Sequence, residues 1–184
     1  APGGKSTLLS SLLSPESVLV SNEVIRSRVN ILQENIVRWG HANNIITQSD
    51  TQQFSKLDAC FDAMIVDAPC SGSGLFRKDA AALNEWSEAN VNLCSDRQQR
   101  IVSNLIPALK AGGVLMYCTC SYSVQENEEI VNWLCAEHGL ELVDLTIPSE
   151  WNIVHSQKGC YRFYPYKLAG EGFFMAVLRK KGSP

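Results

Sequence analysis

Hydrophobic and polar positions follow two different periods along this chain. Ile25, Val29, Leu32 and Ile36 recur at spacings of four, three and four, which predicts an amphipathic helix that ends at Gly40. Short apolar runs bounded by turn residues predict buried strands instead. The predicted strands are 17–21, 45–46, 63–66, 114–119, 141–145 and 173–178, and the other predicted helices are 5–13, 90–109 and 124–138.

Strands and helices alternate along most of the chain, an order typical of an α/β protein whose parallel sheet lies between layers of helices. The last two predicted strands have no helix between them, only a long aromatic loop at 151–172. We therefore expect those two strands to pair antiparallel at the sheet edge. A mostly parallel sheet with an antiparallel last strand is typical of methyltransferases that use S-adenosylmethionine.

The chain opens on a glycine turn, Ala1-Pro2-Gly3-Gly4-Lys5, and a turn of this kind normally follows a strand. We therefore interpret the chain as a fragment of a longer protein, with the first strand of the sheet missing. The length of 184 residues suits a single domain. We assign residues 1–181 to one methyltransferase catalytic domain and 182–184 to a linker or terminus.

Charge and hydropathy narrow the possible partners. The formal net charge is −3, so no bulk basic field indicates nucleic acid, although an enzyme that binds RNA through one groove need not be basic overall. No apolar run approaches the length of a membrane span. We expect neither a membrane partner nor a signal peptide.

The chain has seven cysteines but no CxxC pair, so the usual zinc-ribbon and thioredoxin spacings are absent. We predict no metal site, and free thiols in a reducing, cytoplasmic setting. Cys70 and Cys120 differ from the rest because each lies in a loop directly after a predicted strand. Loops after neighbouring parallel strands meet at the carboxyl edge of a sheet, so both thiols could face one pocket. One thiol could then attack a substrate while the other manages a proton.

Acidic residues also follow predicted strands. Glu23, Asp50 and Asp67 each lie at or just beyond a strand end, and Gly3-Gly4 forms a tight turn where backbone can approach a ligand. Carboxylates in this register accept hydrogen bonds from the ribose and amino groups of a nucleoside-type cofactor. Any one of these acids, taken alone, is more often a solvated loop residue or a helix cap.

A phosphate-binding loop is the rival interpretation of the chain's start. Gly4-Lys5-Ser6-Thr7 resembles the end of a P-loop, and the strand at 64–67 resembles the apolar strand and acid that bind Mg²⁺ in such proteins. Pro2 would crowd that loop, however, and Glu23 has no role in it. The nucleotide interpretation also leaves the two strand-end cysteines unexplained.

With these residues in view, the chain resembles the Sun-type (NOL/NOP/Sun) family of RNA cytosine-5 methyltransferases, especially its bacterial ribosomal-RNA members. The likeness covers essentially the whole chain. Its main motifs are Ala-Pro-Gly-Gly-Lys at 1–5, Asp-Ala-Pro-Cys-Ser-Gly-Ser-Gly at 67–74 and Thr-Cys-Ser at 119–121. Further matching segments are 22–23, 77–79, 125–128 and 171–174.

The resemblance implies a Rossmann-like sheet, S-adenosylmethionine as cofactor, and RNA as substrate, with ribosomal RNA favoured over transfer RNA. RNA-binding regions are expected outside this chain. Cys120 matches the family's nucleophile and Cys70 its second catalytic cysteine. The implied cofactor contacts are Ala1, Pro2, Gly3, Gly4, Lys5, Glu23, Asp50 and Asp67.

In the implied mechanism the Cys120 thiolate adds to C6 of cytosine, which makes C5 nucleophilic enough to take up a methyl group. Cys70, directly or through water, is expected to remove the C5 proton afterwards. Asp67 is expected to hydrogen-bond the N3/N4 edge of the base, and Lys5 to position Asp67 or the base. The target base must be unstacked for this attack.

Two further functions compete with this hypothesis. A methyltransferase that acts on an exocyclic amine would carry an aromatic residue where this chain has Cys70. An inactive cofactor-binding subunit would lack one of the two cysteines, and both are present. Two features are candidate RNA contacts. Arg77-Lys78 is either a phosphate contact or a solvated loop. A strip in the aromatic loop could face RNA, although aromatic residues in a long loop more often pack beneath it; its residues are Lys158, Tyr161, Arg162, Phe163, Tyr164, Tyr166 and Lys167.

Overall fold

The computed structural model describes residues 3–182 and divides into two compact units, residues 1–53 and 54–184. Ala1 and Pro2, two of the predicted cofactor contacts, lie outside the described residues.

The first unit contains a two-stranded parallel sheet and two helices. The helix predicted from the four-residue apolar stripe is present and ends at Gly40, whose φ of 85° is left-handed. Leu32 and Ile36 of that stripe are buried, whereas Ile25 is half exposed and only caps the helix. The elements are α1 (Gly4–Leu12), β1 (Leu19–Asn22), α2 (Arg26–Trp39), β2 (Asn44–Thr47) and a short helix α3 (Thr51–Phe54) that leads to the second unit.

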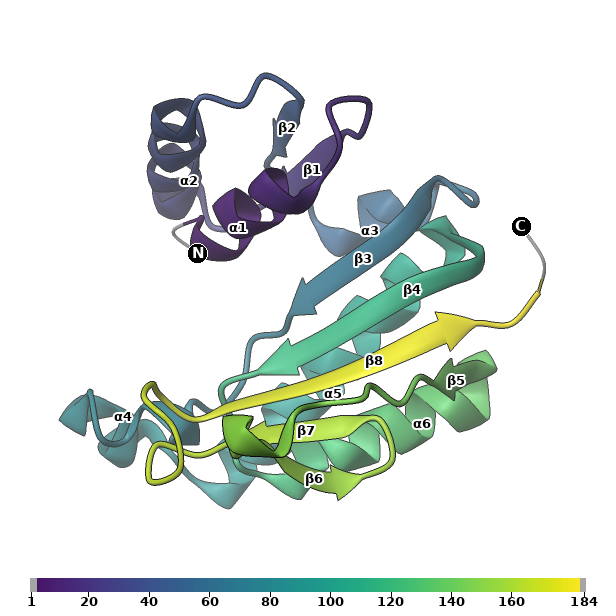
Figure 1. The fold of residues 1–184 in the computed structure, drawn as a ribbon. Helices are drawn as coiled ribbons and strands as arrows, with labels where there is room; N and C mark the ends of the chain where they lie inside the picture. Colours follow the sequence, from purple (N-terminus) through teal and green to yellow (C-terminus); the bar gives the residue numbers. More distant parts are fainter. Residues whose placement is uncertain (1–2, 183–184) are drawn as a thin grey trace. The chain divides into compact units, whose positions relative to one another are not determined.

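The second unit is built on a six-stranded sheet with the order β3-β4-β8-β7-β6, on which β5 also pairs with β8 (Figure 1). Its strands are β3 (Phe61–Asp67), β4 (Leu109–Thr119), β5 (Leu140–Leu142), β6 (Val154–Gln157), β7 (Cys160–Phe163) and β8 (Phe173–Lys180). The pair β3–β4 is parallel, as is β1–β2 in the first unit, and the last strand β8 runs antiparallel to β4. The antiparallel last strand confirms the sequence prediction.

The aromatic loop predicted at 151–172 is wrong in part, because it contains the hairpin β6–β7. Gln157 pairs with Cys160 across a two-residue turn, Lys158-Gly159, and Gly159 has a left-handed φ of 70°. β7 pairs antiparallel with β8, so β8 lies between β4 and β7. The antiparallel pairing of β5 with β8 is confirmed, but β8 is not an edge strand.

Helices α5 (Glu88–Leu105) and α6 (Glu128–His138) cover one face of this sheet (Figure 1). The helix predicted to reach residue 109 ends earlier, because Pro107 cannot donate a helical hydrogen bond and Leu109 already pairs with Phe61. The helix predicted from residue 124 is interrupted at Asn127. The remaining short elements are α4 (Ala80–Glu85) and four 3-10 turns at Ser73–Leu75, Ile106–Ala108, Val124–Glu126 and Ser149–Trp151.

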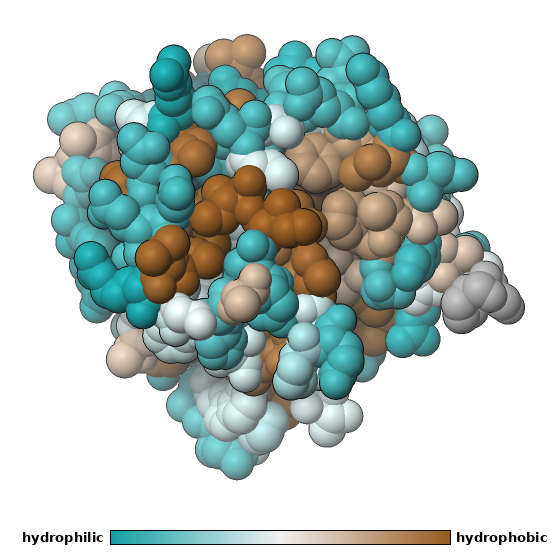
Figure 2. Space-filling view, turned by 90° about the horizontal axis from the view of Figure 1, so that it is seen from above, coloured by the Kyte–Doolittle hydropathy of each residue, from teal (hydrophilic) through white to brown (hydrophobic). Residues whose placement is uncertain are grey.

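Most buried hydrophobic side chains belong to the second unit, where the core joins the sheet to α5 and α6. Tyr117 and Phe174 of neighbouring strands meet edge to face, with ring centroids 6.4 Å apart. The surface is mixed, and Figure 2 shows hydrophobic residues gathered among hydrophilic ones on the face seen from above. Across residues 3–182, none of the helices has both the length and the apolar character that a membrane span requires.

Candidate active site

The two strand-end thiols meet, as the sequence predicts. Cys70 lies in the loop after β3, and Cys120 follows directly on β4. The two strands are parallel neighbours, and the Ala68 N–H extends their pairing with a 2.9 Å hydrogen bond to the carbonyl oxygen of Cys118. This register brings the Sγ atoms of Cys70 and Cys120 to 3.0 Å. Both residues are half-buried.

The contact makes the two thiols chemically unequal. The hydrogen bond to Cys120, reinforced by burial, raises the pKa of Cys70 far above its ordinary value. The same hydrogen bond lowers the pKa of Cys120, and this effect exceeds the opposing effects of burial and of the nearby Asp67 carboxylate. The opposite directions of the two pKa shifts favour Cys120 over Cys70 as the thiolate of the pair.

Backbone hydrogen bonds bind three loops together beside the thiols. The Gly74 N–H donates to the carbonyl oxygen of Cys120 at 2.8 Å, and the Gly172 N–H donates to that of Gly74 at 2.9 Å. A Cβ at Gly74 would lie 2.5 Å from the carbonyl oxygen of Gly172 and 2.7 Å from that of Cys120. Only glycine fits there, because the backbones approach too closely for any side chain.

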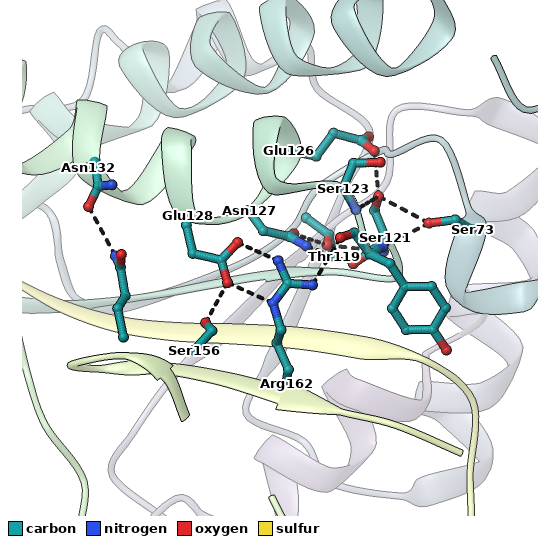
Figure 3. Close-up of polar contacts among 12 residues, drawn as sticks. Ser73, Thr119, Ser121, Ser123, Glu126, Asn127, Glu128, Asn132, Ser156 and Arg162 are labelled. Atoms are coloured by element: carbon teal, nitrogen blue, oxygen red, sulfur yellow. Dashed lines mark hydrogen bonds and ion pairs between the residues drawn. The ribbon is translucent and has the colours of Figure 1, made fainter. Parts of the chain in front are cut away.

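A buried carboxylate lies below the thiol loops. Glu126 is 0% exposed and accepts hydrogen bonds from Ser71, Ser121 and Gln98. Figure 3 shows its side chain and that of Ser121 pointing toward each other. Glu126 entered the sequence analysis only within the matching segment 125–128, and no local pattern in the sequence marks its side chain as buried.

Asn127, the residue after Glu126, forms hydrogen bonds with the two residues that flank Cys120. The Asn127 amide accepts a 2.6 Å hydrogen bond from the Thr119 hydroxyl and donates one of 2.7 Å to the carbonyl oxygen of Ser121. Asn127 has φ −117° and ψ −94°, far from helical values, which explains why the predicted helix is interrupted here. The side chains flanking Cys120 are thus fixed on both sides (Figure 3).

Part of the candidate RNA-facing strip is buried in the structure, beginning with Arg162. It is buried and forms an ion pair with Glu128, to which its Nε donates at 2.7 Å, and its Nη1 donates to the carbonyl oxygen of Tyr122 at 3.0 Å (Figure 3). Tyr161 is likewise buried, because it lies on a paired strand of the sheet. Phe163 packs edge to face on Phe173, with centroids 5.6 Å apart.

Three other aromatic rings form a column at the site. Tyr122 stacks on Tyr164 with ring centroids 5.6 Å apart, and Tyr164 stacks on Tyr166 with centroids 5.3 Å apart. Tyr122 follows Cys120 by two residues, whereas Tyr166 is 75% exposed. Lys167 beside it in the chain is exposed, as is Lys158. We call Tyr122, Tyr164 and Tyr166 the tyrosine column.

The predicted cofactor residues of the first unit gather at one end of its sheet. The Glu23 N–H donates to the carbonyl oxygen of Thr47 at 3.1 Å, which joins the carboxyl ends of β1 and β2. Ser21 donates to Ser6 at 3.0 Å and so holds the start of α1 against this end. Gly3, at the turn into α1, has a left-handed φ of 107°.

The carboxylates at this end already have protein partners. Glu23 accepts from the Ile25 N–H at 3.0 Å and lies 3.3 Å from Arg28 Nε. Asp50 accepts from the Gln52 N–H at 2.8 Å and caps α3, the role that the sequence left open for any single acid.

The remaining predicted residues divide between the two units. Lys5 is exposed at the start of α1 in the first unit, with Gly4 before it. Asp67 is exposed at the end of β3 in the second unit, where it pairs in register with Cys118. Among residues 3–182, no group of three or more His, Cys, Asp and Glu side chains is placed to bind a metal ion.

The known proteins that this chain is similar to are named as ribosomal RNA methyltransferases. The sequence model of a family described as 16S rRNA methyltransferase RsmB/F matches residues 1–179. A protein from Pectobacterium atrosepticum named ribosomal RNA small subunit methyltransferase F is 39% identical over 189 residues, covering 100% of this chain and 39% of the relative. A protein of the same name from Vibrio parahaemolyticus is 38% identical over 188 residues, with the same two coverages. The chain therefore spans well under half the length of these relatives.

Solved structures of similar sequence have a similar fold along nearly the whole of this chain. A structure described as NSun6 from Pyrococcus horikoshii with SFG has a TM-score of 0.85 and 30% identity, covering 100% of this chain and 46% of that one. A methyltransferase homolog protein from Pyrococcus horikoshii has a TM-score of 0.80 and 30% identity, covering 98% of this chain and 59% of that one.

Proposed function

Since the chain belongs to the 16S rRNA methyltransferase RsmB/F family and has the Rossmann-like α/β fold predicted for it, we propose that it transfers a methyl group from S-adenosylmethionine to C5 of a cytosine in RNA. The observation that carries this proposal is the 3.0 Å contact between the sulfurs of Cys70 and Cys120 on adjacent strand-end loops. Ribosomal RNA is the proposed substrate and the cytoplasm the proposed location. That residues 1–181 form one catalytic domain stays a prediction.

The first unit fits S-adenosylmethionine. A Cβ at Gly3 would lie 3.3 Å from side-chain atoms of Leu32 and Asn35, so the tight turn into α1 depends on glycine. Glu23 and Asp50 place carboxylates after two adjacent parallel strands, and each carboxylate has acceptor capacity beyond its present partners. We assign Gly3, Gly4, Lys5, Glu23 and Asp50 to the cofactor. A solved relative was determined with SFG, an analogue of this cofactor.

Cys120 is the proposed nucleophile. Its thiolate forms a bond to C6 of the cytosine, and the electron pair of the C5–C6 double bond becomes available at C5. S-adenosylmethionine, when bound, supplies the electrophilic methyl group that C5 takes up. C5 then carries both a methyl group and a proton. Loss of that proton returns its electron pair to the ring double bond and expels Cys120 as a thiolate.

Cys70 is the proposed base for that proton. Its pKa is expected to be high before Cys120 bonds to C6 and to fall afterwards, when the base is needed. While Cys120 is a thiolate, its hydrogen bond and its charge hold the pKa of Cys70 high. Once the Cys120 sulfur is bonded to C6, it carries no charge and accepts that hydrogen bond poorly. Cys70 can then release its own proton to solvent and accept the C5 proton, directly or through water.

Asp67 is proposed to hold the base. Asp67 is the exposed last residue of β3, three residues before Cys70, and its carboxylate can accept a hydrogen bond from the cytosine N4 amine while favouring a proton on N3. Charge that Cys120 adds to the ring is stabilised in this way. The cofactor role of Asp67 and the catalytic role of Lys5 stay predictions.

The tyrosine column supports an RNA substrate. An exposed tyrosine ring at the end of a stacked column provides a flat surface for a nucleobase, and Lys167 beside it can contact a phosphate. Because the target cytosine must leave its stack, a neighbouring base needs a new stacking partner. We propose that Tyr166 is that partner. Transfer RNA is the alternative substrate, and RNA-binding regions outside this chain stay a prediction.

Trapping the covalent intermediate tests the proposal. The full-length protein is incubated with 16S ribosomal RNA and S-adenosylmethionine, and denaturant-resistant protein–RNA adducts are resolved on a gel. Cys70→Ala is expected to accumulate adduct, because the thiolate adds but cannot be released. Cys120→Ala is expected to form none. The reverse pattern would exchange the two roles.

Methylation by wild type without adduct in any variant would instead contradict covalent catalysis and favour transfer to an exocyclic amine. Binding of S-adenosylmethionine without methylation of ribosomal or transfer RNA would favour the inactive cofactor-binding subunit. Stabilisation by ATP but not by S-adenosylmethionine would favour the P-loop interpretation.

A further inference from the structure

Glu126 is a buried carboxylate that accepts hydrogen bonds from neutral donors. Its Oε1 accepts from the Ser71 N–H at 2.7 Å and from Gln98 Nε2 at 3.2 Å. Its Oε2 accepts from the hydroxyls of Ser71 and Ser121, both at 2.5 Å. Hydrogen bonds to a charged acceptor are shorter and stronger than neutral ones, and burial strengthens them further.

These donors flank both thiols. Ser71 is the residue after Cys70, and Ser121 is the residue after Cys120. Gln98 of α5 also donates to the carbonyl oxygen of Pro69, the residue before Cys70, at 2.9 Å. One carboxylate thus holds two loops that lie 50 residues apart in the sequence. The residues that it binds, Ser71 and Ser121, are the chain neighbours of the two cysteines.

Glu126 is itself anchored to the core. The buried Tyr117 of β4 donates its hydroxyl to the backbone carbonyl oxygen of Glu126 at 2.7 Å. The Asn127 side chain, next in the chain, bonds both Thr119 and Ser121. Glu126 is therefore anchored to the core, and Figure 3 shows its carboxylate bonded to Ser121.

We infer that Glu126 is a positioning residue that sets the spacing of the Cys70 and Cys120 sulfurs by binding Ser71 and Ser121 together. The inference about spacing stands on this chain's own contacts. Its consequence for methyl transfer rests on the proposed function.

A purely electrostatic role for Glu126 predicts a different result. The negative charge of Glu126 disfavours the Cys120 thiolate, so removing the charge alone lowers the pKa of Cys120. Loss of positioning has the opposite sign, because separated sulfurs lose the hydrogen bond from Cys70 that lowers this pKa. The direction of the change in Glu126→Gln therefore separates the two roles.

The test uses thiol chemistry and needs neither RNA nor S-adenosylmethionine. Wild type, Glu126→Gln and the exposed-site control Glu129→Gln are equilibrated in glutathione redox buffers, and the fraction of Cys70–Cys120 disulfide is measured by peptide mass spectrometry. Oxidised glutathione takes up the two electrons and becomes two reduced molecules as the S–S bond forms. The pH midpoint of Cys120 alkylation by iodoacetamide is measured in parallel.

In Glu126→Gln we expect the disulfide equilibrium constant to fall at least tenfold, about 30 mV in reduction potential, and the alkylation midpoint to rise. Glu129→Gln is expected to match wild type in both. Circular dichroism checks that each variant is folded. If Glu126→Gln fails to fold, Ser121→Ala, which deletes one of the bonds to Glu126, is expected to show the same two changes at smaller size.

A folded variant with an unchanged equilibrium constant, or with a lowered alkylation midpoint, would overturn the inference. The trapping experiment above has a separate readout. Failure to form RNA adduct with a normal disulfide response would refute the proposed function and leave the positioning role intact.

Discussion

The backbone N–H of Gly74 donates a 2.8 Å hydrogen bond to the carbonyl oxygen of Cys120. This bond connects the loop after β3 to the residue that follows β4, and it exists because Gly74 has no side chain. The loop that carries Cys70 is therefore held to Cys120 by backbone as well as by the carboxylate of Glu126.

Gly74→Ala is expected to destabilise the protein, because its Cβ would overlap the carbonyl oxygens of Gly172 and Cys120. Overpacking of this kind costs about 1–3 kcal/mol or more. The measurement is the free energy of unfolding in urea. The matched control is Gly72→Ala in the same loop, where a Cβ meets no atom within 4 Å and only the left-handed φ of 75° is strained. A loss in Gly74→Ala no larger than in the control would contradict the close-packing account.

Cys70→Ala is expected to raise the pKa of Cys120 toward that of an ordinary thiol, because the hydrogen bond from Cys70 is the main cause that lowers it. Only the thiolate is alkylated, so the rate at Cys120 falls as pH drops through this pKa, and the midpoint moves up in the variant. Cys70→Ser keeps an O–H donor and is expected to retain a lowered midpoint. Peptide-resolved alkylation with iodoacetamide measures the pH midpoint of Cys120 in each variant. Equal midpoints in Cys70→Ala and Cys70→Ser would refute the role of the hydrogen bond from Cys70.

Glu128→Gln is expected to lower the free energy of unfolding by about 3–5 kcal/mol, because it leaves the buried charge of Arg162 without its partner. Glu141→Gln, which breaks an exposed pair with Lys181, is the control and is expected to change it by less than about 1 kcal/mol. Urea unfolding of both variants near neutral pH measures the difference.

Protonation of Glu128 at low pH is expected to remove part of the same free energy of unfolding. Burial alone would raise the pKa of Glu128, but hydrogen bonds from Arg162 and Ser156 outweigh it, so the net pKa is lowered from 4.5. A lowered folded-state pKa contributes stability that is present above the unfolded value and is lost as pH falls through the folded value. The decline in unfolding free energy below about pH 4.5 should therefore be shallower in Glu128→Gln than in wild type, and parallel curves would contradict the assignment.

Tyr166→Ala is expected to raise KM for RNA with little change in kcat, because it removes an exposed stacking surface and touches neither thiol. Stacking on an aromatic ring contributes about 1–3 kcal/mol per base, so the increase should be about fivefold or more. Tyr166→Phe keeps the ring and should behave like wild type. Steady-state methylation of ribosomal RNA separates KM from kcat. A fall in kcat alone would show that the column acts on the chemistry rather than on binding.

Glu23→Gln is expected to weaken S-adenosylmethionine binding about tenfold, since hydrogen bonds to a charged acceptor contribute about 1.5–3 kcal/mol. Isothermal titration calorimetry without RNA measures the affinity. Glu16→Gln, an exposed acid of the same unit, is the control. Unchanged affinity in Glu23→Gln would remove Glu23 from the cofactor site and leave it as a partner of Arg28 and of the Ile25 N–H.

Short-range patterns in the sequence were enough to predict most of the local elements and to place the two thiols where they could face one pocket. The helix at 26–39 follows from a four-residue apolar stripe, and its end follows from Gly40. The prediction that Cys70 and Cys120 could face one pocket rests on a rule about neighbouring parallel strands, because each cysteine lies in the loop that follows such a strand. These inferences need only short-range periodicity and the position of a residue relative to a strand end.

Which polar residues are buried together depends on long-range contacts that local patterns do not contain. Glu126 and Ser71 are 55 residues apart, and Arg162 and Glu128 are 34 apart. No local pattern distinguishes a buried charged side chain from a solvated one. The sequence therefore left Arg162 as a candidate RNA contact and gave Glu126 no role. A charged side chain enters the interior only when distant donors or a counter-charge compensate its lost hydration, and the folded chain alone brings those partners to it.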